Sequence, residues 1–330
     1  YGLGVDRIAP MLWDAGCRFF FTATLPEAIQ VRALLPHAGI SVLNGLVPGC
    51  EPLFTEHEIA PALGSLEQVA HWKAHGVRIG KALPALLHVD TGMSRTGLDA
   101  GEWQTVLATP DLLDGVDWLY LMSHLSCSDE PESPENPRQL EAFQTIRQNC
   151  PKPMKFSLAN SAACLFDSGY HFDIARPGIG LYGGNPRADR QNPHTCPIRL
   201  EGRILQTRTI AAGTPVSYGA TWRAKRETRI ATLGAGYADG YLRSLSDRGR
   251  VAFGDQICPI IGRVTMDTIM ADVTDLPPEH TQPGMYAELL GPTITPDDTA
   301  VAAGTISYEL LTSLGARYAR HYIDTGSPTA

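Results

Sequence analysis

Short apolar runs alternate with amphipathic stretches in the first half of the chain. Seven runs of strand-like character lie at residues 19–24, 41–45, 61–65, 86–90, 118–124, 156–160 and 173–176. Between them, residues 26–35, 66–75 and 137–148 show the spacing of helices that bury one face. Apolar strands that alternate with helices predict a parallel sheet that is covered on both faces.

Seven strands are one fewer than the eight that close a (β/α)8 barrel. Residues 1–4 are loop-like and residues 6–15 have the pattern of a helix, so we expect the first strand to precede Tyr1. The predicted fold is therefore α/β, a TIM-like (β/α)8 barrel without its first strand. An open, doubly wound sheet of seven strands is the alternative, although no Gly-x-Gly-x-x-Gly motif opens any helix.

The pattern changes after about residue 183. A connector rich in proline and arginine, residues 185–197, leads into alternating or β-branched runs at 198–210, 228–232 and 257–272. Such runs are typical of an antiparallel sheet. We therefore expect a barrel domain at residues 1–195 and a mainly antiparallel β domain at residues 196–330, with one helix over 305–314.

Composition narrows the classes of function. The chain of 330 residues carries a formal net charge of −8, which argues against nucleic acid as a partner because such binders need a basic face. No apolar run is long enough to span a bilayer, so no membrane partner is expected. The seven cysteines are scattered and never spaced Cys-x-x-Cys, which fits free thiols in a reducing cytoplasm and predicts no metal site.

Polar residues gather where the predicted strands end, and in a barrel that edge holds the active site. Those at or just past a carboxyl strand end are residues 90–95, His124, Asn160, Ser161 and Arg176. One such residue alone is more often a buried hydrogen-bonding group, but several on one edge indicate a site. Gly178 and Ile179 offer backbone N–H groups, and with the Ser161 hydroxyl they predict a phosphate site. A tight turn is the alternative explanation for the glycine.

Several short motifs, taken in order, resemble those of the alanine racemase family, whose members are pyridoxal-phosphate enzymes built from a barrel and a β domain. The motifs cover nearly the whole chain and include Asp90-Thr-Gly-Met-Ser-Arg95, Ser123-His-Leu, Asn160-Ser161, Arg176-Pro-Gly178, Ser217-Tyr-Gly-Ala-Thr221, Thr265-Met-Asp267 and Ser307-Tyr-Glu309. Each motif alone is weak, whereas their order and spacing are highly specific.

The resemblance implies that the protein interconverts L-alanine and D-alanine by two-base proton transfer on an aldimine of pyridoxal 5′-phosphate, supplying D-alanine for peptidoglycan. One base is Tyr218, which in the family reaches the site from the partner subunit of a homodimer. The other is the lysine that holds the cofactor, which in the family precedes the position matched by Tyr1. No lysine of this chain can be placed at a carboxyl strand end, so we expect the chain as given to be inactive.

A tyrosine has a pKa near 10 and is a weak base at neutral pH unless a positive charge stabilises its phenolate. The resemblance implies that His124, held by Arg176, supplies the polar chain beside the tyrosine. It also places Arg176 against the pyridine nitrogen of the cofactor. Because a guanidinium has only donors, that nitrogen stays unprotonated, which disfavours transamination.

The resemblance assigns binding roles as well. Arg95 contacts the cofactor and the substrate carboxylate, the backbone N–H of Met266 donates to the same carboxylate, and Tyr237 keeps the side-chain pocket small. Asp267 is expected to support these residues without contacting the substrate. The residues that surround the phosphate are Tyr1, Ser161, Gly178, Ile179 and Tyr308.

His88 is a departure from the family pattern. Many members carry there a lysine, carbamylated by carbon dioxide, that orients the arginine matched by Arg95. A histidine cannot form this carbamate. Our hypothesis is that His88 or a bound anion orients Arg95 instead.

Two other functions stay open. A broader amino-acid or serine racemase differs only in the walls of the side-chain pocket, which the sequence does not resolve. A non-catalytic pyridoxal-phosphate-binding protein of the same barrel type lacks the β domain, so the Tyr218 and Met266 motifs argue against it. The sequence also leaves open whether the enzyme serves biosynthesis or catabolism.

Overall fold

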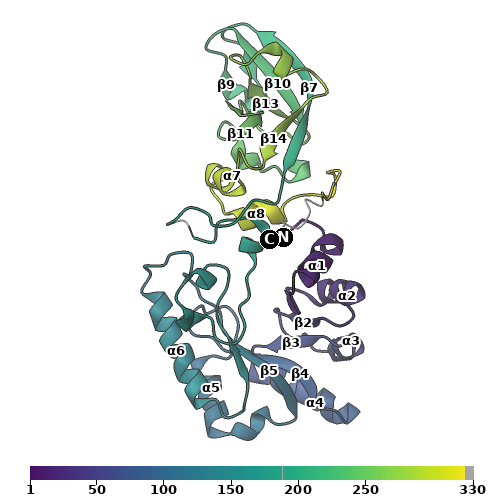
Figure 1. Ribbon diagram of the computed structural model, residues 1–330, viewed down its shortest axis with the longest axis vertical. Coiled ribbons are helices and arrows are strands. Elements are labelled where there is room, and N and C mark those ends of the chain that lie inside the picture. The colour runs from purple at the N-terminus through teal and green to yellow at the C-terminus, as the bar shows by residue number, and fades with distance from the viewer. Residues whose placement is uncertain (188, 324–330) are drawn as a thin grey trace. The chain divides into compact units, whose positions relative to one another are not determined.

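The computed structural model describes residues 1–187 and 189–323, which form two compact units (Figure 1). The barrel unit consists of Gly4–Gly178 and Pro186–Gln191. The sheet unit consists of Tyr1–Leu3, Ile179–Asn185 and the chain from Asn192 onward. Each unit therefore takes in a short segment from the other half of the sequence. No helix in the described ranges is long and apolar enough to cross a membrane.

The barrel unit contains one sheet of six parallel strands in sequential order. They are β1 (Phe19–Thr22), β2 (Gly39–Val42), β3 (Ala60–Leu63), β4 (Leu83–His88), β5 (Val116–Met122) and β6 (Lys155–Ser157). The order never reverses, as it must in a doubly wound sheet, so that alternative is excluded. The predicted α/β fold with a barrel-type parallel sheet is confirmed, and the sheet is an open part of a barrel.

One predicted strand is wrong. Residues 173–176 form no strand, and only a single parallel bridge joins Asn160 to Arg176. Arg176 N donates to Ala159 O over 2.8 Å, so the segment follows the edge of the sheet for one residue only. The strand expected before Tyr1 lies outside the chain and stays a prediction.

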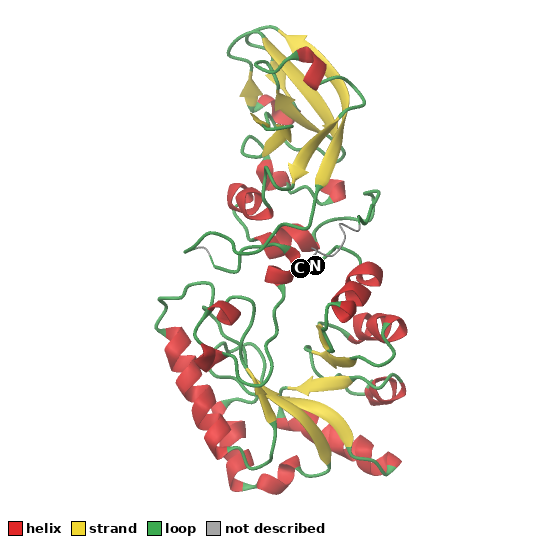
Figure 2. Cartoon of the chain, viewed as in Figure 1, coloured by secondary structure: helices red, strands yellow, loops and turns green. Residues whose placement is uncertain are grey.

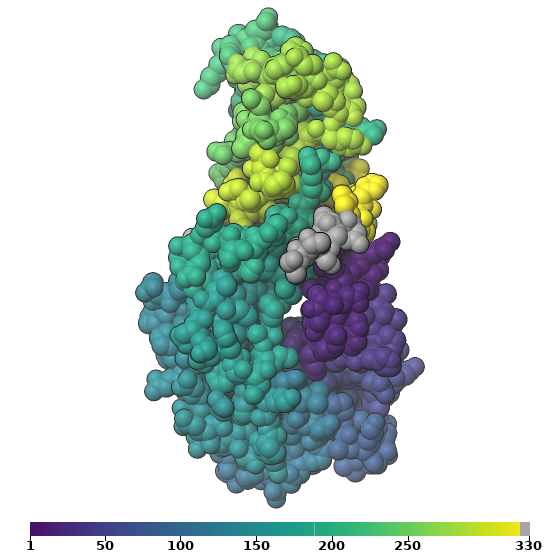
Figure 3. Space-filling model, in the orientation of Figure 1, coloured from purple at the N-terminus to yellow at the C-terminus, as the bar shows by residue number. Residues whose placement is uncertain are grey.

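Helices cover the outer side of this sheet (Figure 2). They are α1 (Val5–Asp14), α2 (Leu25–Leu34), α3 (Glu51–Glu56), α4 (Leu66–Ile79), α5 (Ala100–Ala108) and α6 (Glu135–Asn149). Local signals fix their ends: the Ser65 hydroxyl accepts from Gln68 N over 3.2 Å, and Gly80 ends α4 in the left-handed region. In the space-filling view, α1 and α2 (purple) flank one side of the unit and α6 (blue-green) the other (Figure 3).

Buried apolar side chains explain why the parallel strands carry no alternating pattern. All four residues of β3 are buried, and so are five of the six in β4. Because the strands are parallel, their carboxyl ends lie at one edge of the sheet. Residues 89–99 follow β4 there, His124 follows β5 and Ser161 follows β6. The sequence-based grouping of these residues on one edge is thus confirmed.

The sheet unit contains an antiparallel sheet of six strands; its antiparallel character was predicted, and the number of strands comes from the structure. Its strands, in spatial order, are β12 (Gln256–Pro259), β11 (Arg250–Phe253), β14 (Tyr286–Leu290), β7 (Leu200–Ile210), β10 (Thr228–Gly234) and β13 (Ile269–Asp272). A small hairpin joins β8 (Pro215–Val216) to β9 (Trp222–Arg223). Two helices, α7 (Pro296–Ala303) and α8 (Ser307–Thr312), follow the sheet, and α8 lies within the predicted helix 305–314.

Candidate active site

Arg176 is the centre of a hydrogen-bond network at the carboxyl edge of the parallel sheet. Its Nη1 donates to Ser157 Oγ over 2.5 Å, and its Nη2 donates to Ser123 O over 2.6 Å and to His124 Nδ1 over 3.3 Å. Burial lowers the pKa of Arg176 to about 10, so the guanidinium stays charged at neutral pH. Its Nε makes no hydrogen bond with any described residue and can donate to a ligand.

His124 is neutral in this network. Burial, and then the charge of Arg176, lower the pKa of His124 to about 3. Because Nδ1 accepts from Arg176, the imidazole proton lies on Nε2, which is then a donor toward a ligand. The positive charge of the pair therefore resides on Arg176, and His124 is its neutral, polar partner.

The loop after β4 presents Arg95. The Asp90 carboxylate accepts from the N–H groups of Gly92, Met93 and Ser94 at distances between 2.9 and 3.2 Å. Burial opposes the effect, but these three backbone donors lower the pKa of Asp90 below its ordinary value. Arg95 itself is exposed and has no hydrogen bond or ion pair with the described part of the chain.

Asp90 was predicted only as part of the group at residues 90–95. The signal was present, since an aspartate two residues before a glycine is typical of a turn closed by its own carboxylate. The structure identifies Asp90 as the residue that holds the loop on which Arg95 stands.

His88 ends β4 and is buried. Its Nδ1 lies 3.4 Å from Thr96 Oγ1, and no hydrogen bond joins it to Arg95 among the described residues. Burial, followed by the charges of Arg176 and Arg95, lowers the pKa of His88 to about 4. The contact of His88 is thus with Thr96, the residue next to Arg95, and the hypothesis that His88 or a bound anion orients Arg95 stays a prediction.

The expected phosphate-binding residues fall into two groups. In the barrel unit, Gly178 N donates to Ser161 Oγ over 2.6 Å, so this N–H is not open as predicted. In the sheet unit, Ile179 begins a short 3-10 turn, and its N–H has no partner among the described residues. The Tyr1 ring stacks on Tyr182 with centroids 4.4 Å apart and lies 6.1 Å from the Tyr308 ring. Two of the predicted tyrosines are thus brought together.

Tyr218 stands on a strained loop of the sheet unit. Ser217, Gly219 and Ala220 all have positive φ angles, of 63°, 74° and 48°, and two of them are not glycine. Ser217 Oγ donates to Arg263 O over 2.7 Å and holds the loop against its neighbour. Strained backbone of this kind persists only where surrounding structure enforces it. The Tyr218 side chain is 71% exposed, and its hydroxyl has no hydrogen bond within the described residues.

Met266 and Tyr237 are held together by paired loops. Tyr237 N donates to Thr265 O, and Ala238 N donates to Met266 O, both over 3.0 Å. The loops touch at Gly236, where a Cβ would lie 2.3 Å from Met266 O. The Met266 N–H itself makes no hydrogen bond in residues 1–187 and 189–323. Asp267, the next residue, accepts from Arg317 Nη1 over 2.8 Å.

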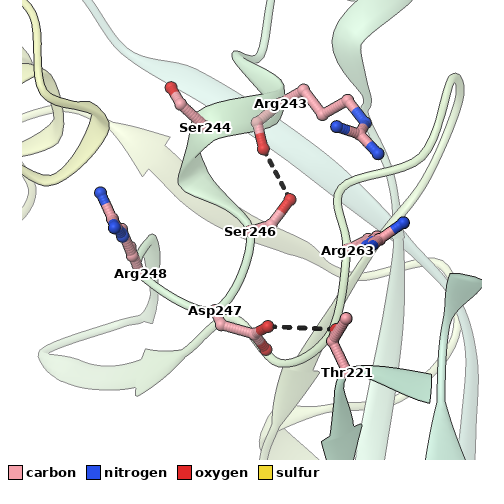
Figure 4. A pocket seen from close by; sticks show the side chains of 7 residues that line it. All are labelled: Thr221, Arg243, Ser244, Ser246, Asp247, Arg248 and Arg263. Atoms are coloured by element: carbon pink, nitrogen blue, oxygen red, sulfur yellow. Dashed lines mark hydrogen bonds between the residues drawn. The ribbon is translucent and has the colours of Figure 1, made fainter. Parts of the chain in front are cut away.

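An arginine-lined hollow of about 370 Å³ lies beside the Tyr218 loop (Figure 4). Arg243 and Arg263 extend to one side of it and Arg248 to the other (Figure 4). None of these three arginines forms an ion pair with a carboxylate in the described ranges, whereas Asp247 accepts from Gly262 N over 2.5 Å. Sequence analysis missed this hollow, because arginines at 243, 248 and 263 form no local motif.

A second hollow of about 520 Å³ has Tyr218 and Thr265 in its wall. Apolar side chains make up much of the rest, among them Ile210, Val216 and Met270. The exposed tyrosine therefore stands next to an apolar surface.

Known families match both units. The family described as "Alanine racemase, N-terminal domain" matches residues 1–186, and that described as "Alanine racemase, C-terminal domain" matches residues 198–322. An alanine racemase of Acidiphilium cryptum is 48% identical over 97% of this chain and 88% of the relative. A catabolic alanine racemase of Agrobacterium fabrum is 45% identical over 100% of this chain and 85% of the relative.

Solved structures agree with these matches. An alanine racemase of Bartonella henselae, with covalently bound pyridoxal phosphate, has a TM-score of 0.94 at 39% identity. The match covers 98% of this chain and 90% of that one. A biosynthetic alanine racemase of Pseudomonas aeruginosa has a TM-score of 0.91 at 36% identity, over 98% and 90% of the two chains.

Proposed function

The chain belongs to the alanine racemase family, whose reaction interconverts L-alanine and D-alanine with pyridoxal phosphate, and we propose which of its residues perform that reaction. One observation carries the proposal. The Arg95 guanidinium, the Met266 N–H and the Tyr218 hydroxyl make no hydrogen bond in the part of the chain that the structure describes. Polar groups that a fold leaves unpaired on its surface are available to a ligand.

Arg95 and Met266 bind the carboxylate of alanine. A guanidinium fork matches the two oxygens of a carboxylate, and a backbone N–H adds a donor of fixed direction. Asp90 supports the first group by holding its loop, and the paired loops at Gly236 support the second. Tyr237, beside Met266, limits the space for the substrate side chain and so favours alanine.

Tyr218 is the base that this chain supplies. An ordinary tyrosine is a weak base at neutral pH, and its phenolate requires a donor and a positive charge. Nε2–H of the neutral His124 is that donor, and Arg176 behind it supplies the charge. We place Tyr218 of one subunit of a homodimer against the partner's His124, and its 71% exposure beside an apolar hollow supports this arrangement.

The residues present fit pyridoxal phosphate. Arg176 Nε is an unpaired donor that would face the pyridine nitrogen, while Ser161, Gly178, Ile179, Tyr1 and Tyr308 would surround the phosphate. When bound, the cofactor withdraws electrons from the α-carbon of the amino acid and so makes its proton removable. Tyr218 then moves that proton on one face of the substrate.

The four lysines of the barrel unit do not lie at the edge of the sheet that bears Arg95, His124 and Arg176. Lys155 begins β6 and Lys81 precedes β4, so both belong to the opposite edge. Lys152 forms an ion pair with Asp114, and Lys73 donates to Asp111 O. This chain therefore contributes the tyrosine base, and a cytoplasmic homodimer is the assembly we propose for it.

Racemisation of L-alanine tests the assignment. It is measured with added pyridoxal phosphate, on the chain as given and on a version extended before Tyr1 by a strand that ends in lysine. In the active form, Tyr218→Phe is expected to lower kcat in the L-to-D direction at least about 100-fold, since it removes an acid–base group. Cofactor absorbance is expected to stay unchanged.

Tyr286→Phe is the matched control, because Tyr286 is an exposed tyrosine of the same unit on β14. Equal activity of Tyr218→Phe and wild type would contradict the assignment. A broader racemase is distinguished by comparing kcat/KM for L-serine with that for L-alanine.

A further inference from the structure

Arg317 joins two carboxylates that lie behind the substrate-binding loops. Its Nε lies 3.3 Å from Asp239 Oδ1, and its Nη1 lies 2.8 Å from Asp267 Oδ1. We propose that Arg317 is a positioning residue that fixes the Met266 N–H for the carboxylate of alanine. This inference rests on the proposed function and deepens it.

Hydrogen bonds hold the Met266 segment on both sides, since Thr265 also pairs with Thr268, yet they leave one backbone donor unused. The carbonyls of Thr265 and Met266 accept from Tyr237 N and Ala238 N, but the Met266 N–H has no partner among the described residues. The direction of that N–H depends on the peptide plane between Thr265 and Met266 and on the residue that follows. Arg317 binds that following residue, Asp267, through its side chain.

Asp239, the other carboxylate that Arg317 contacts, is held firmly in place. Asp239 is 7% exposed, and its Oδ2 accepts from Gly236 N over 2.8 Å, which closes the turn that carries Tyr237. Its Oδ1 faces Arg317, so the buried carboxylate is both hydrogen-bonded and ion-paired. Arg317 thereby couples the Tyr237 turn to the Met266 loop.

The backbone near Arg317 is held in place as well. Gly315 N donates to Asp239 O over 2.9 Å. Gly240 has a φ of 94°, and a Cβ there would lie 2.0 Å from Ser313 O, so the two segments pack backbone to backbone. The guanidinium therefore extends from a fixed point.

Positioning, not folding stability, is the role that this geometry supports. Asp267 and Arg317 are both more than half exposed, and ion pairs between exposed side chains add little to stability. Arginine suits the position because Nε and Nη1 reach two carboxylates at once, whereas lysine offers a single nitrogen. Tyr218 stands on a different loop, so its proton transfer does not depend on Arg317.

The test uses the active form, extended before Tyr1 by a strand that ends in lysine and loaded with cofactor, and this form without substitutions is the wild type of the comparison. The ligand is propionate, which retains the carboxylate of alanine and lacks its amino group. Arg317→Gln is expected to raise the Kd of propionate and the KM of L-alanine about tenfold, with kcat changed less than threefold. For Arg317→Lys, the Kd and the KM are expected to lie between those of wild type and those of Arg317→Gln. Arg250→Gln, at an exposed arginine on β11, is the control and should match wild type.

Amide hydrogen exchange gives a readout that does not depend on turnover. Ala238 N–H, which donates to Met266 O, is expected to exchange faster in Arg317→Gln than in wild type. Asp267→Asn should reproduce the KM effect, and the double variant should be no worse than either single one, because both break one contact.

Two results separate the failures. If wild type neither binds propionate nor racemises alanine, the proposed function fails. If wild type does both and Arg317→Gln leaves the Kd, the KM and the exchange of Ala238 unchanged, the positioning role alone is overturned. The positioning role would also be overturned if Arg317→Gln lowered both kcat and the unfolding free energy, since that pattern denotes a structural role.

Discussion

Arg176 Nη2 donates to His124 Nδ1 over 3.3 Å, between residues 52 positions apart in the sequence. The guanidinium has no carboxylate partner among the described residues and is balanced by hydroxyl and carbonyl oxygens. Burial, and then the charge of Arg176, lower the pKa of His124, while the guanidinium keeps its own charge. The pair therefore presents a neutral donor, Nε2–H, backed by a positive charge.

Arg176→Lys is expected to impair both folding and racemisation. Lysine cannot serve Ser123, Ser157 and His124 together, so at least one buried acceptor loses its donor. Such a loss costs about 1–3 kcal/mol of unfolding free energy. Urea unfolding and L-alanine kinetics check this, with the exposed Arg138→Lys as control. An active, fully stable Arg176→Lys protein would contradict the network described here.

Folding stability is expected to fall as the pH decreases from about 6.5 toward 4. The folded-state pKa values of His88 and His124, about 4 and about 3, lie below the ordinary value of 6.5. The unfolded chain therefore binds more protons in this range, and stability is present above pH 6.5 and lost below it. One pKa unit corresponds to about 1.4 kcal/mol, so the loss is on the order of a few kcal/mol.

Unfolding midpoints at pH 7, 6 and 5 measure this loss before most carboxylates titrate. His124→Asn should flatten the profile, whereas the exposed His37→Asn should leave it unchanged. A profile that is equally steep in His124→Asn and wild type would count against a buried, neutral His124.

Asp90→Ala is expected to weaken substrate binding. The substitution removes the acceptor of three backbone N–H groups, so the loop that carries Arg95 loses its closure. Hydrogen bonds to a charged acceptor contribute about 1.5–3 kcal/mol each, and this half-buried site should show the lower end. The KM of L-alanine should rise with little change in kcat. Asp117→Ala, on the exposed side of β5, serves as control.

Ala220→Gly is expected to separate stability from activity. Ala220 has a φ of 48°, which glycine adopts without strain, so the variant should be as stable as wild type or up to about 1 kcal/mol more stable. The Tyr218 loop should become less ordered, and kcat should fall. Ala302→Gly inside α7 is the reverse control, with an expected loss of about 0.5–1 kcal/mol. Thermal unfolding and turnover, measured together, decide the outcome.

His88→Ala tests how Arg95 is oriented. If His88 acts through Thr96, then His88→Ala and Thr96→Val should raise the KM of L-alanine to a similar degree. If a bound anion orients Arg95, the activity of wild type should instead respond to added bicarbonate. His88→Ala should then keep full activity. Steady-state kinetics with and without bicarbonate distinguish the two.

The sequence by itself determined the two sheets and the edge on which the barrel-unit residues gather. Strand and helix periodicities are local properties, and parallel strands joined by helices must end at a common edge. The same logic failed at residues 173–176, where local composition favours a strand but only Arg176 is paired, in a single bridge to Asn160. The same reasoning predicted an unpaired N–H at Gly178, although that N–H donates to Ser161 Oγ.

Tertiary structure alone decided the charge states and the supports of the site. That His124 is neutral follows from burial beside Arg176, and that Asp267 is held follows from Arg317, fifty positions later. Burial and long-range pairing depend on which distant segments the fold brings into contact, and no local pattern records that. The sequence thus determined which groups the chain offers for chemistry, and the fold decided which are charged, paired or left available.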